Sequence, residues 1–430
     1  MKIAFQTLGC KVNQYETEAL MADFRKMGYE IAIEGVPADV YIINTCTVTG
    51  MSDRKSRQYI RRAKRESPES VVAVTGCYAH LRHDEVIKIE GVDIVAGNTD
   101  KMSLPGYIEE FLSARGSGSK AGCQKETGVI APQESRTRAH IKIQDGCDRF
   151  CAYCIVPFAR GGLFSKPLNN IISEAESLIN SGYRELVLVG INTALYDDKG
   201  IGLTGVIDGL NSLSGDFRIR LSSLEPTVVD AEYVKSLFKY GKLCLHLHLS
   251  LQSGSDRVLG LMKRNYDMRE YMEIIGELKA FDECYGISTD VIAGFPGESE
   301  DDFLKSVLAI REVNFCKAHV FKYSDRKGTA ASAMGEKVGG DEKKRRSEAL
   351  IKEASESAER FFRRCLGRKT RVLIEEYDKE TGCYTGYSDN YIKTYIEKED
   401  GGGYYLNRFV SVKPKELYKD GMKAEINDKE

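Results

Sequence analysis

The sequence has almost no net charge and no long apolar run. Its 62 Lys and Arg residues nearly balance 64 Asp and Glu residues, so the chain carries no overall basic signature and any contact with nucleic acid must come from local patches. No apolar stretch reaches the roughly 18 residues that a membrane span needs, and the first residues are expected to form a strand rather than a signal peptide. These features predict a cytoplasmic protein with no membrane partner.

The chain also lacks the marks of a disulfide framework. Its 12 cysteines are spread over 430 residues, and nothing in the sequence indicates secretion. A reducing compartment is therefore expected, with some of the thiols serving as metal ligands. The length allows two or three domains, and 42% hydrophobic with 29% charged residues is typical of a globular protein.

One loop carries three closely spaced thiols, Cys147, Cys151 and Cys154, directly after an expected strand at 140–144. No fourth cysteine follows nearby. Three thiolates can hold three corners of a [4Fe-4S] cluster, which leaves the fourth iron open to a small molecule. A structural zinc site would need a fourth ligand, usually from a second cysteine pair. The spacing favours the open cluster; zinc and a chance spacing remain alternatives.

Three further thiols, Cys10, Cys46 and Cys77, each end a short apolar run in the first third of the chain. The runs are 2–10, 39–46 and 70–77, and helical patterns lie between them at 16–27 and 52–65. This β–α–β–α–β order predicts parallel strands whose carboxyl ends meet at one sheet edge. A second three-thiolate cluster is therefore predicted there. A zinc site, or three buried thiols without a ligand, are the alternatives.

The middle of the chain alternates strands and helices. Strands are expected at 140–144, 185–192, 217–223, 245–252, 286–294 and 317–324, followed by a long charged helix at 341–364. Six such units predict an open, partial (β/α)6 barrel, because a closed eight-stranded barrel usually needs about 250 residues. We expect an α/β multidomain fold with these parts: an N-terminal α/β domain at 1–115, a linker rich in Gly, Ser and Lys at 116–136, the barrel at 137–364, and a last domain at 365–430.

Polar residues and glycines follow the barrel strands at their carboxyl ends, where such folds place their chemistry. The candidates for cofactor binding are Gly190, Asn192, Glu225, Gln252, Arg264 and Asp290. Each alone is a weak signal, since strand ends often carry turn residues. His246 and His248 share one face of a strand and are expected to pack or to line the barrel.

The last domain changes pattern to five short strands, at 370–375, 383–389, 392–397, 409–414 and 422–426. They predict a small β-barrel similar to OB-type modules. Tyrosines among cations can stack bases while the cations follow the nucleic-acid backbone; the alternative is that the tyrosines fill a small core. The candidate RNA contacts are Arg160, Lys166, Arg368, Tyr391 and Lys393. A basic helix at 53–65 is either a solvated face or a further phosphate-binding patch.

The C-x3-C-x2-C loop resembles the signature of radical S-adenosylmethionine (SAM) enzymes. Over essentially its whole length the chain resembles the methylthiotransferases, which have an N-terminal cluster domain, a radical SAM barrel and a C-terminal TRAM domain that binds RNA. The segments 7–17, 44–49 and 386–391 look most like the branch that acts on N6-threonylcarbamoyladenosine beside the tRNA anticodon.

This resemblance implies two [4Fe-4S] clusters with separate tasks. Cys147, Cys151 and Cys154 would hold the cluster that splits SAM into an adenosyl radical, and that radical removes hydrogen from C2 of the adenine. The cluster at Cys10, Cys46 and Cys77 would carry the sulfur, methylated by a second SAM. The resemblance further implies tRNA as partner through its anticodon loop, an external electron donor and a monomer.

It also suggests roles in SAM binding. The backbone at 189–192 would bind the amino group, Glu225 and Gln252 the ribose or methionine, the stretch 289–298 the adenine, and Arg264 a carboxylate.

Three segments depart from the family pattern, at 162–166, 190–194 and 322–327. The first replaces arginines that the family usually has after Arg160, and Gly or Phe cannot replace an arginine in binding phosphate or carboxylate. A divergent paralogue that modifies another RNA or a protein side chain therefore remains an alternative. So do a non-catalytic RNA-binding iron–sulfur or zinc protein and an electron-transfer protein, although the latter usually closes each cluster with four cysteines.

Overall fold

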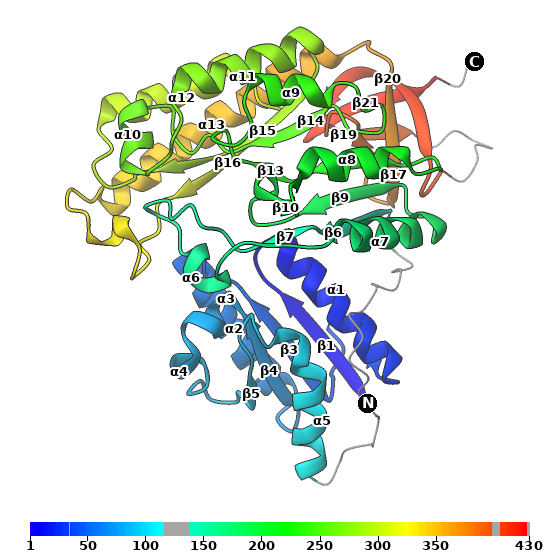
Figure 1. Cartoon of the computed structure of the whole chain (residues 1–430), viewed down its shortest axis with the longest axis vertical. Helices are drawn as coiled ribbons and strands as arrows, with labels where there is room; N and C mark the ends of the chain where they lie inside the picture. The colour runs from blue at the N-terminus through cyan, green and yellow to red at the C-terminus, as the bar shows by residue number, and fades with distance from the viewer. Residues whose placement is uncertain (34, 116–136, 398–404, 428–430) are drawn as a thin grey trace. The chain divides into compact units, whose positions relative to one another are not determined.

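The structure is a computed structural model that describes residues 1–33, 35–115, 137–397 and 405–427 (Figure 1). The expected linker at 116–136, including Cys123, lies outside the described residues. The chain forms two compact units. Unit 1 contains residues 1–132, 145–164 and 324–332, and unit 2 contains 133–144, 165–323 and 333–430. Within the described ranges, no helix is long and apolar enough to cross a membrane.

Unit 1 is built on a parallel sheet in the order β2-β1-β3-β4-β5. The strands are β1 (Lys2–Thr7), β2 (Glu30–Ile31), β3 (Val40–Thr45), β4 (Val71–Gly76) and β5 (Ile94–Val95). The helices are α1 (Lys11–Lys26), α2 (Gly50–Glu66), α3 (Cys77–Leu81), α4 (His83–Val86), the 3-10 turn η1 (Lys101–Ser103), α5 (Leu104–Ala114) and, on the cysteine loop, α6 (Val156–Arg160). The three predicted strands are confirmed. The first helix begins at Lys11, five residues before the predicted start, with Cys10 as its N-cap.

Alternating side chains of this sheet contribute to two separate hydrophobic cores, one on each face. Ile42 on β3 packs with Leu20 and Phe24 of α1 and with Ile108 of α5. Its neighbour Ile43 points to the other face, where it packs with residues of α2. The period-two alternation therefore places α1 and α5 on one face of the sheet and α2 on the other, giving a three-layer α/β/α unit (Figure 1).

Unit 2 contains two parallel sheets, in the orders β12-β9-β6 and β13-β14-β15-β16. Their strands are β6 (Arg138–Lys142), β9 (Glu185–Val189), β12 (Arg218–Leu221), β13 (Ser223–Leu224), β14 (His246–Leu249), β15 (Gly286–Ala293) and β16 (Lys317–Lys322). The helices are α7 (Leu168–Asn180), α8 (Leu203–Ser212), α9 (Ala231–Leu237), α10 (Asp256–Leu261), α11 (Met268–Phe281), α12 (Glu300–Val313) and α13 (Gly340–Cys365). Its shorter elements are η2 (Thr193–Leu195), β10 (Asp197–Asp198) and β11 (Ile201–Gly202). Three more, β7 (Gln144–Asp145), β8 (Phe164–Ser165) and η3 (Ala330–Ala333), have residues in both units.

All six predicted strand positions are occupied, but the third strand is interrupted. Its first part, β12, pairs with β9, and the Ser222 amide still donates to Leu188 O at 3.1 Å. The next residue, Ser223, instead pairs with His248 of β14. The continuous strand predicted at 217–223 is therefore divided at Ser222, although Ile219 of β12 also forms a parallel bridge with Leu243, just before β14.

The C-terminal strands close into a five-stranded barrel in the order β17-β18-β19-β21-β20, coloured orange to red in Figure 1. They are β17 (Thr370–Asp378), β18 (Cys383–Ser388), β19 (Lys393–Glu397), β20 (Phe409–Tyr418) and β21 (Gly421–Ile426). Val372, Ile374 and Val412 belong to its core. The prediction of five short strands forming a small barrel is confirmed.

Buried charges join this barrel to the parallel sheets of unit 2. Glu185 on β9 is fully buried and accepts from Arg218 at 2.6 Å and from Arg220 at 2.8 Å. Arg218 also donates to Asp389 Oδ1 at 2.7 Å, in the turn between β18 and β19. A Cβ on Gly286 would lie 2.2 Å from Asn390 O, so the backbones approach each other closely at this position.

Candidate functional site

The three N-terminal thiols meet at the carboxyl edge of the unit 1 sheet. Cys10 follows β1, Cys46 follows β3, and Cys77 follows β4 as the first residue of α3. Burial, with the nearby Cys77 and Cys10 thiols, raises the pKa of Cys46 to about 11. Gly9 has φ +98°, and a Cβ on it would lie 2.8 Å from Cys46 Sγ. The convergence predicted from the β–α–β order is therefore present, and a glycine makes room for it.

The second set of thiols lies on a tightly folded loop of the same unit. The Cys147 amide donates to Gly161 O at 3.2 Å, and the Cys154 amide donates to Cys151 O at 2.9 Å. Gly146 has φ +71°, and a Cβ on it would lie 1.8 Å from Gly162 O. Position 146 thus requires glycine for two reasons: its φ is positive, and the backbone of Gly161 and Gly162 leaves no room for a Cβ.

Arg160 ties the cysteine loop to α1. Its guanidinium donates to Asp145 Oδ1 at 2.9 Å, to Glu16 Oε1 at 3.0 Å and to Asn13 Oδ1 at 2.5 Å, and its side chain is 2% exposed. Burial acts to lower the pKa of Arg160, but Glu16, Cys77 and Asp145 outweigh burial and raise it above its ordinary value. Lys101 also pairs with Glu16. Arg160, a predicted RNA contact, therefore lies inside an ion-pair network of unit 1.

Asn98 contacts Cys77 and also α6, the short helix that follows the second set of cysteines. Its Nδ2 atom donates to Ala159 O, on the cysteine loop, at 2.7 Å, and lies 3.6 Å from Cys77 Sγ. One amide group thus fixes the distance between the loop and the third N-terminal thiol. Sequence reasoning missed Asn98, because a single asparagine after a short strand carries no pattern.

A further arginine supports the loop after β3. Arg326 donates to Asp53 Oδ2 at 2.5 Å and to Thr47 Oγ1, next to Cys46, at 2.8 Å. The amide of Gly50 donates to Ser324 Oγ at 3.0 Å. The off-pattern segment at 322–327 therefore includes residues that brace the neighbourhood of Cys46.

The predicted SAM-binding residues fall into two contacting groups in unit 2. In the first, Asn192 Nδ2 donates to Glu225 Oε2 at 2.5 Å, and Arg264 Nη1 lies 3.0 Å from Glu225 Oε1. Gln144, which sequence reasoning did not select, accepts from the amides of Ile191 and Asn192 at 3.0 and 2.9 Å. A Cβ on Gly190 would lie 3.0 Å from this Gln144 oxygen.

In the second group, Gln252 follows β14 and forms an isolated bridge with Val291 of β15, the strand that carries Asp290. The Gln252 amide donates to Asp290 O at 2.8 Å, and Gln252 has a left-handed backbone with φ +63°. A non-glycine residue held in this region costs on the order of 1 kcal/mol and is a feature of functional sites. The Asp290 carboxylate lies 3.3 Å from His248 Nε2, and His248 shares the Ser288 hydroxyl with His246. The two histidines thus pack against β15, in agreement with the expectation that they pack or line the barrel.

The other predicted RNA contacts have partners within unit 2. Lys166 pairs with Glu174, and Arg368 pairs with Asp282 at 3.0 Å. Lys393 lies 3.8 Å from Asp420. Tyr391 stacks on Tyr387 with ring centroids 4.9 Å apart, and Arg220 lies over its ring. Tyr391 is thus part of the junction between the C-terminal barrel and the parallel sheets.

The donor set fits iron–sulfur chemistry. Thiolates are the preferred ligands of such clusters, and each set supplies three, the first after β1, β3 and β4 and the second on the loop before α6. Among the residues that the structure describes, no three Cys, His, Asp or Glu side chains are placed to hold a single metal ion.

Comparison with known proteins identifies both halves of the chain. Residues 2–97 match the family described as "Uncharacterized protein family UPF0004", and residues 141–310 match the Radical SAM superfamily. Among solved structures, the chain resembles the radical SAM methyltransferase TsrM from Kitasatospora setae, with a TM-score of 0.57, 13% identity and 77% of each chain covered. This likeness shows the radical SAM fold.

Relatives of similar length are much closer in sequence. The chain is 40% identical to the threonylcarbamoyladenosine tRNA methylthiotransferase MtaB of Bacillus subtilis, covering 96% of this chain and 93% of that protein. It is 38% identical to MtaB of Aquifex aeolicus, covering 88% and 94%. It is 31% identical to the tRNA-2-methylthio-N(6)-dimethylallyladenosine synthase of Opitutus terrae, covering 90% and 89%. The chain therefore belongs to the radical SAM methylthiotransferases, in the family of MtaB.

Proposed function

We propose that this enzyme adds a methylthio group to N6-threonylcarbamoyladenosine in tRNA, at C2 of the adenine next to the anticodon. Two observations support the substrate: the 40% identity to MtaB over nearly the whole chain, and the lower identity to the dimethylallyladenosine synthase. The observation that carries the reaction is the presence of two three-cysteine sets in one compact unit, joined by Asn98.

The enzyme uses SAM and a [4Fe-4S] cluster, as radical SAM enzymes do, and members of its family carry an additional cluster. We assign the first cluster to Cys147, Cys151 and Cys154 and the second to Cys10, Cys46 and Cys77. The chemistry that these groups supply when bound is reductive cleavage of SAM and delivery of sulfur.

The protein's own residues position these groups. Arg160 and Asn98 hold the cysteine loop against α1 and Cys77, so the loop cannot move independently of the N-terminal thiols. Asn192, Glu225 and Arg264 form a connected polar group suited to the ribose and the amino-acid part of SAM. The carboxylate of Asp290 and the strained backbone of Gln252 complete the proposed SAM site.

The finer architecture belongs to the same proposal. We take the two parallel sheets of unit 2 as one open (β/α)6 barrel and residues 365–430 as a TRAM domain that contacts the tRNA. The domain division at 115, 137 and 365 follows from this. A cytoplasmic location fits the same account, since the proposed substrate is tRNA. We also propose that the enzyme is a monomer and receives electrons from an external donor.

Nucleoside analysis of tRNA tests the substrate. The chain would be expressed in a host that lacks the modification, beside the Cys10/Cys46/Cys77→Ala variant and a Cys383→Ser control in the C-terminal barrel. We expect 2-methylthio-threonylcarbamoyladenosine with the wild-type chain and the control only. Methylthiolation of dimethylallyladenosine instead would assign the chain the substrate of the sister enzymes and overturn the proposal.

A further inference from the structure

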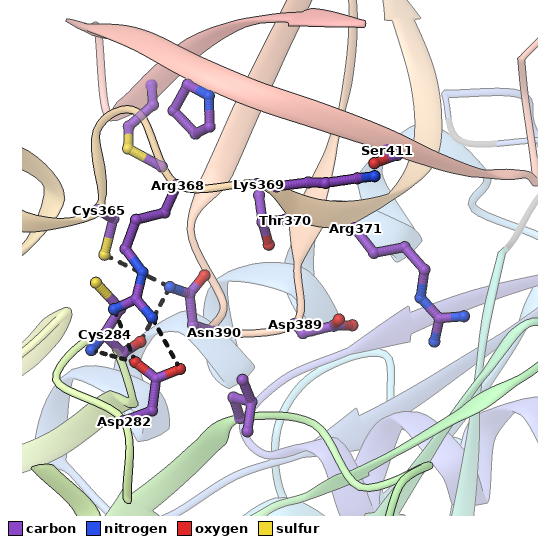
Figure 2. A pocket seen from close by; sticks show the side chains of 13 residues that line it. Asp282, Cys284, Cys365, Arg368, Lys369, Thr370, Arg371, Asp389, Asn390 and Ser411 are labelled. Atoms are coloured by element: carbon purple, nitrogen blue, oxygen red, sulfur yellow. Dashed lines mark hydrogen bonds and ion pairs between the residues drawn. The ribbon is translucent and has the colours of Figure 1, made fainter. Parts of the chain in front are cut away.

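Two thiols outside the cluster sites face each other in unit 2. Cys284 lies between α11 and β15, and Cys365 is the last residue of α13. Figure 2 shows their sulfur atoms pointing toward one another. Asn390 bridges the two residues, because its Nδ2 atom donates to Cys284 O at 3.1 Å and lies 3.6 Å from Cys365 Sγ.

Both thiols line a pocket of about 280 Å³. Three cations, Arg368, Lys369 and Arg371, and two carboxylates, Asp282 and Asp389, also line it (Figure 2). Asp282 is held by Arg368 at 3.0 Å and by the Cys284 amide at 2.7 Å. The pocket therefore offers more positive than negative charge to a small molecule that enters it.

The surroundings of Cys284 favour its thiolate. A hydrogen bond from Cys365 and the neighbouring Arg368 guanidinium lower the pKa of Cys284 to about 7, against the opposing effects of burial and of Asp282. Cys365 has its pKa raised, because it gives the hydrogen bond to Cys284. Two other buried thiols of unit 2, Cys244 and Cys316, have pKa values raised to about 12 by burial. Within this group only Cys284 thus has the character of an attacking nucleophile.

We propose that Cys284 and Cys365 form a redox-active thiol pair, which small disulfides bearing carboxylates oxidise through this pocket. The Cys284 thiolate attacks one sulfur of the small disulfide, whose S–S bond breaks and releases one small thiolate. Cys365 then attacks Cys284 Sγ, its proton passes to the released thiolate, and the second small group leaves as a thiolate. The two protein sulfurs lose two electrons in forming their disulfide, and the small disulfide gains them and becomes one thiol and one thiolate.

The internal disulfide would link the start of β15 to the end of α13, beside the junction with the C-terminal barrel. It would also remove the thiolate that Arg368 faces, leaving Asp282 as the partner of that arginine. The site is separate from the cluster cysteines and does not depend on the proposed tRNA substrate.

The test uses the full chain with its clusters in place, handled without oxygen and treated with oxidised glutathione. Peptide mapping by mass spectrometry should find Cys284 linked to Cys365. In Cys365→Ser the reaction should stop at a glutathione adduct on Cys284, and in Cys284→Ser residue Cys365 should stay reduced. A wild-type chain without the linked peptide, or an adduct on Cys365 in Cys284→Ser, would overturn the proposal.

Two comparisons sharpen the result. Alkylation of Cys284 by iodoacetamide should be at least tenfold faster than that of Cys316 or Cys244. Its rate should fall as the pH drops below about 7, because the Cys284 thiolate becomes protonated there. The charged or titratable groups around it are Arg368, Asp282 and Cys365. Oxidised glutathione should react at least tenfold faster than the cationic disulfide cystamine. Equal alkylation rates for the three thiols would contradict the assignment of Cys284 as the nucleophile. A faster reaction with cystamine would contradict the proposal that the pocket takes disulfides bearing carboxylates.

Discussion

At the scale of single residues, Arg160 decides how the cysteine loop is held. It is buried and pairs with Glu16 and Asp145, and removing it would leave Glu16 paired with Lys101 and would take a cation away from Asp145. Its contribution is therefore structural and local to the two cysteine sets.

The variant Arg160→Met tests this role. We expect it to lower the free energy of unfolding of unit 1 by about 3 kcal/mol, because the buried Glu16 and the half-buried Asp145 lose a shared cation while Lys101 still pairs with Glu16. Arg62→Met, at an exposed pair with Glu66 at 2.7 Å, should cost about 0.5 kcal/mol or less. Denaturant unfolding followed by a probe in unit 1 measures both, and equal effects would contradict the account.

Glu225 is the residue that connects the first group of proposed SAM contacts. The variant Glu225→Gln removes the charge that pairs with Arg264, so we expect SAM to bind about tenfold more weakly, or ~1.4 kcal/mol. The exposed Glu232→Gln is the control. Calorimetric titration with SAM measures both variants, and wild-type affinity in Glu225→Gln would remove this residue from the site.

At the scale of elements, glycine conformation fixes the cysteine loop. Gly146 and Gly161 both have positive φ, but only Gly146 would bring a Cβ against backbone, at 1.8 Å from Gly162 O. Gly146→Ala should therefore prevent the loop from closing and lose the iron held by Cys147, Cys151 and Cys154. Gly162→Ala is the control, because a Cβ on Gly162 meets nothing within 4 Å and its φ is not positive, so this variant should keep the iron. Iron analysis that finds no difference between the variants would contradict this.

The elements themselves were largely predictable, and the contacts between them were not. Apolar runs ending at Cys10, Cys46 and Cys77 predict strands because a buried parallel strand is apolar throughout. The break of the third strand at Ser222 has no local signal, since it depends on which neighbour each half pairs with. Likewise, the apolar and glycine-rich sequence around Arg160 gives no sign of its partner Glu16, which lies 144 positions earlier.

At the scale of the whole chain, Glu185 helps to hold the C-terminal barrel in unit 2. Burial acts to raise its pKa, but Arg218 and Arg220 outweigh burial and lower it far below the ordinary value of 4.5. Because the folded-state pKa is depressed, the stabilisation is complete above the unfolded-state value and is lost only as the pH falls below it.

The variant Glu185→Gln should therefore loosen the junction. We expect faster amide exchange in the turn between β18 and β19, because Arg218 and Arg220 lose their buried counter-charge. In the wild-type chain, Glu185 stays ionised at pH 5, so the turn should still be protected from exchange at that pH. Arg269→Ala, at an exposed pair with Glu273, is the control. Loss of protection in the wild-type chain already at pH 5 would contradict the assigned pKa direction.

The central claim is that one chain holds two separate clusters on two sets of three cysteines. It is tested most directly by counting iron and sulfide after anaerobic reconstitution of the wild-type chain and of the two triple Cys→Ala variants. We predict about eight iron atoms in the wild-type chain and about four in each variant. SAM cleavage should be lost only in the Cys147/Cys151/Cys154→Ala variant. About four iron atoms in the wild-type chain, or a variant that loses all iron when only one set is removed, would contradict the two-site account.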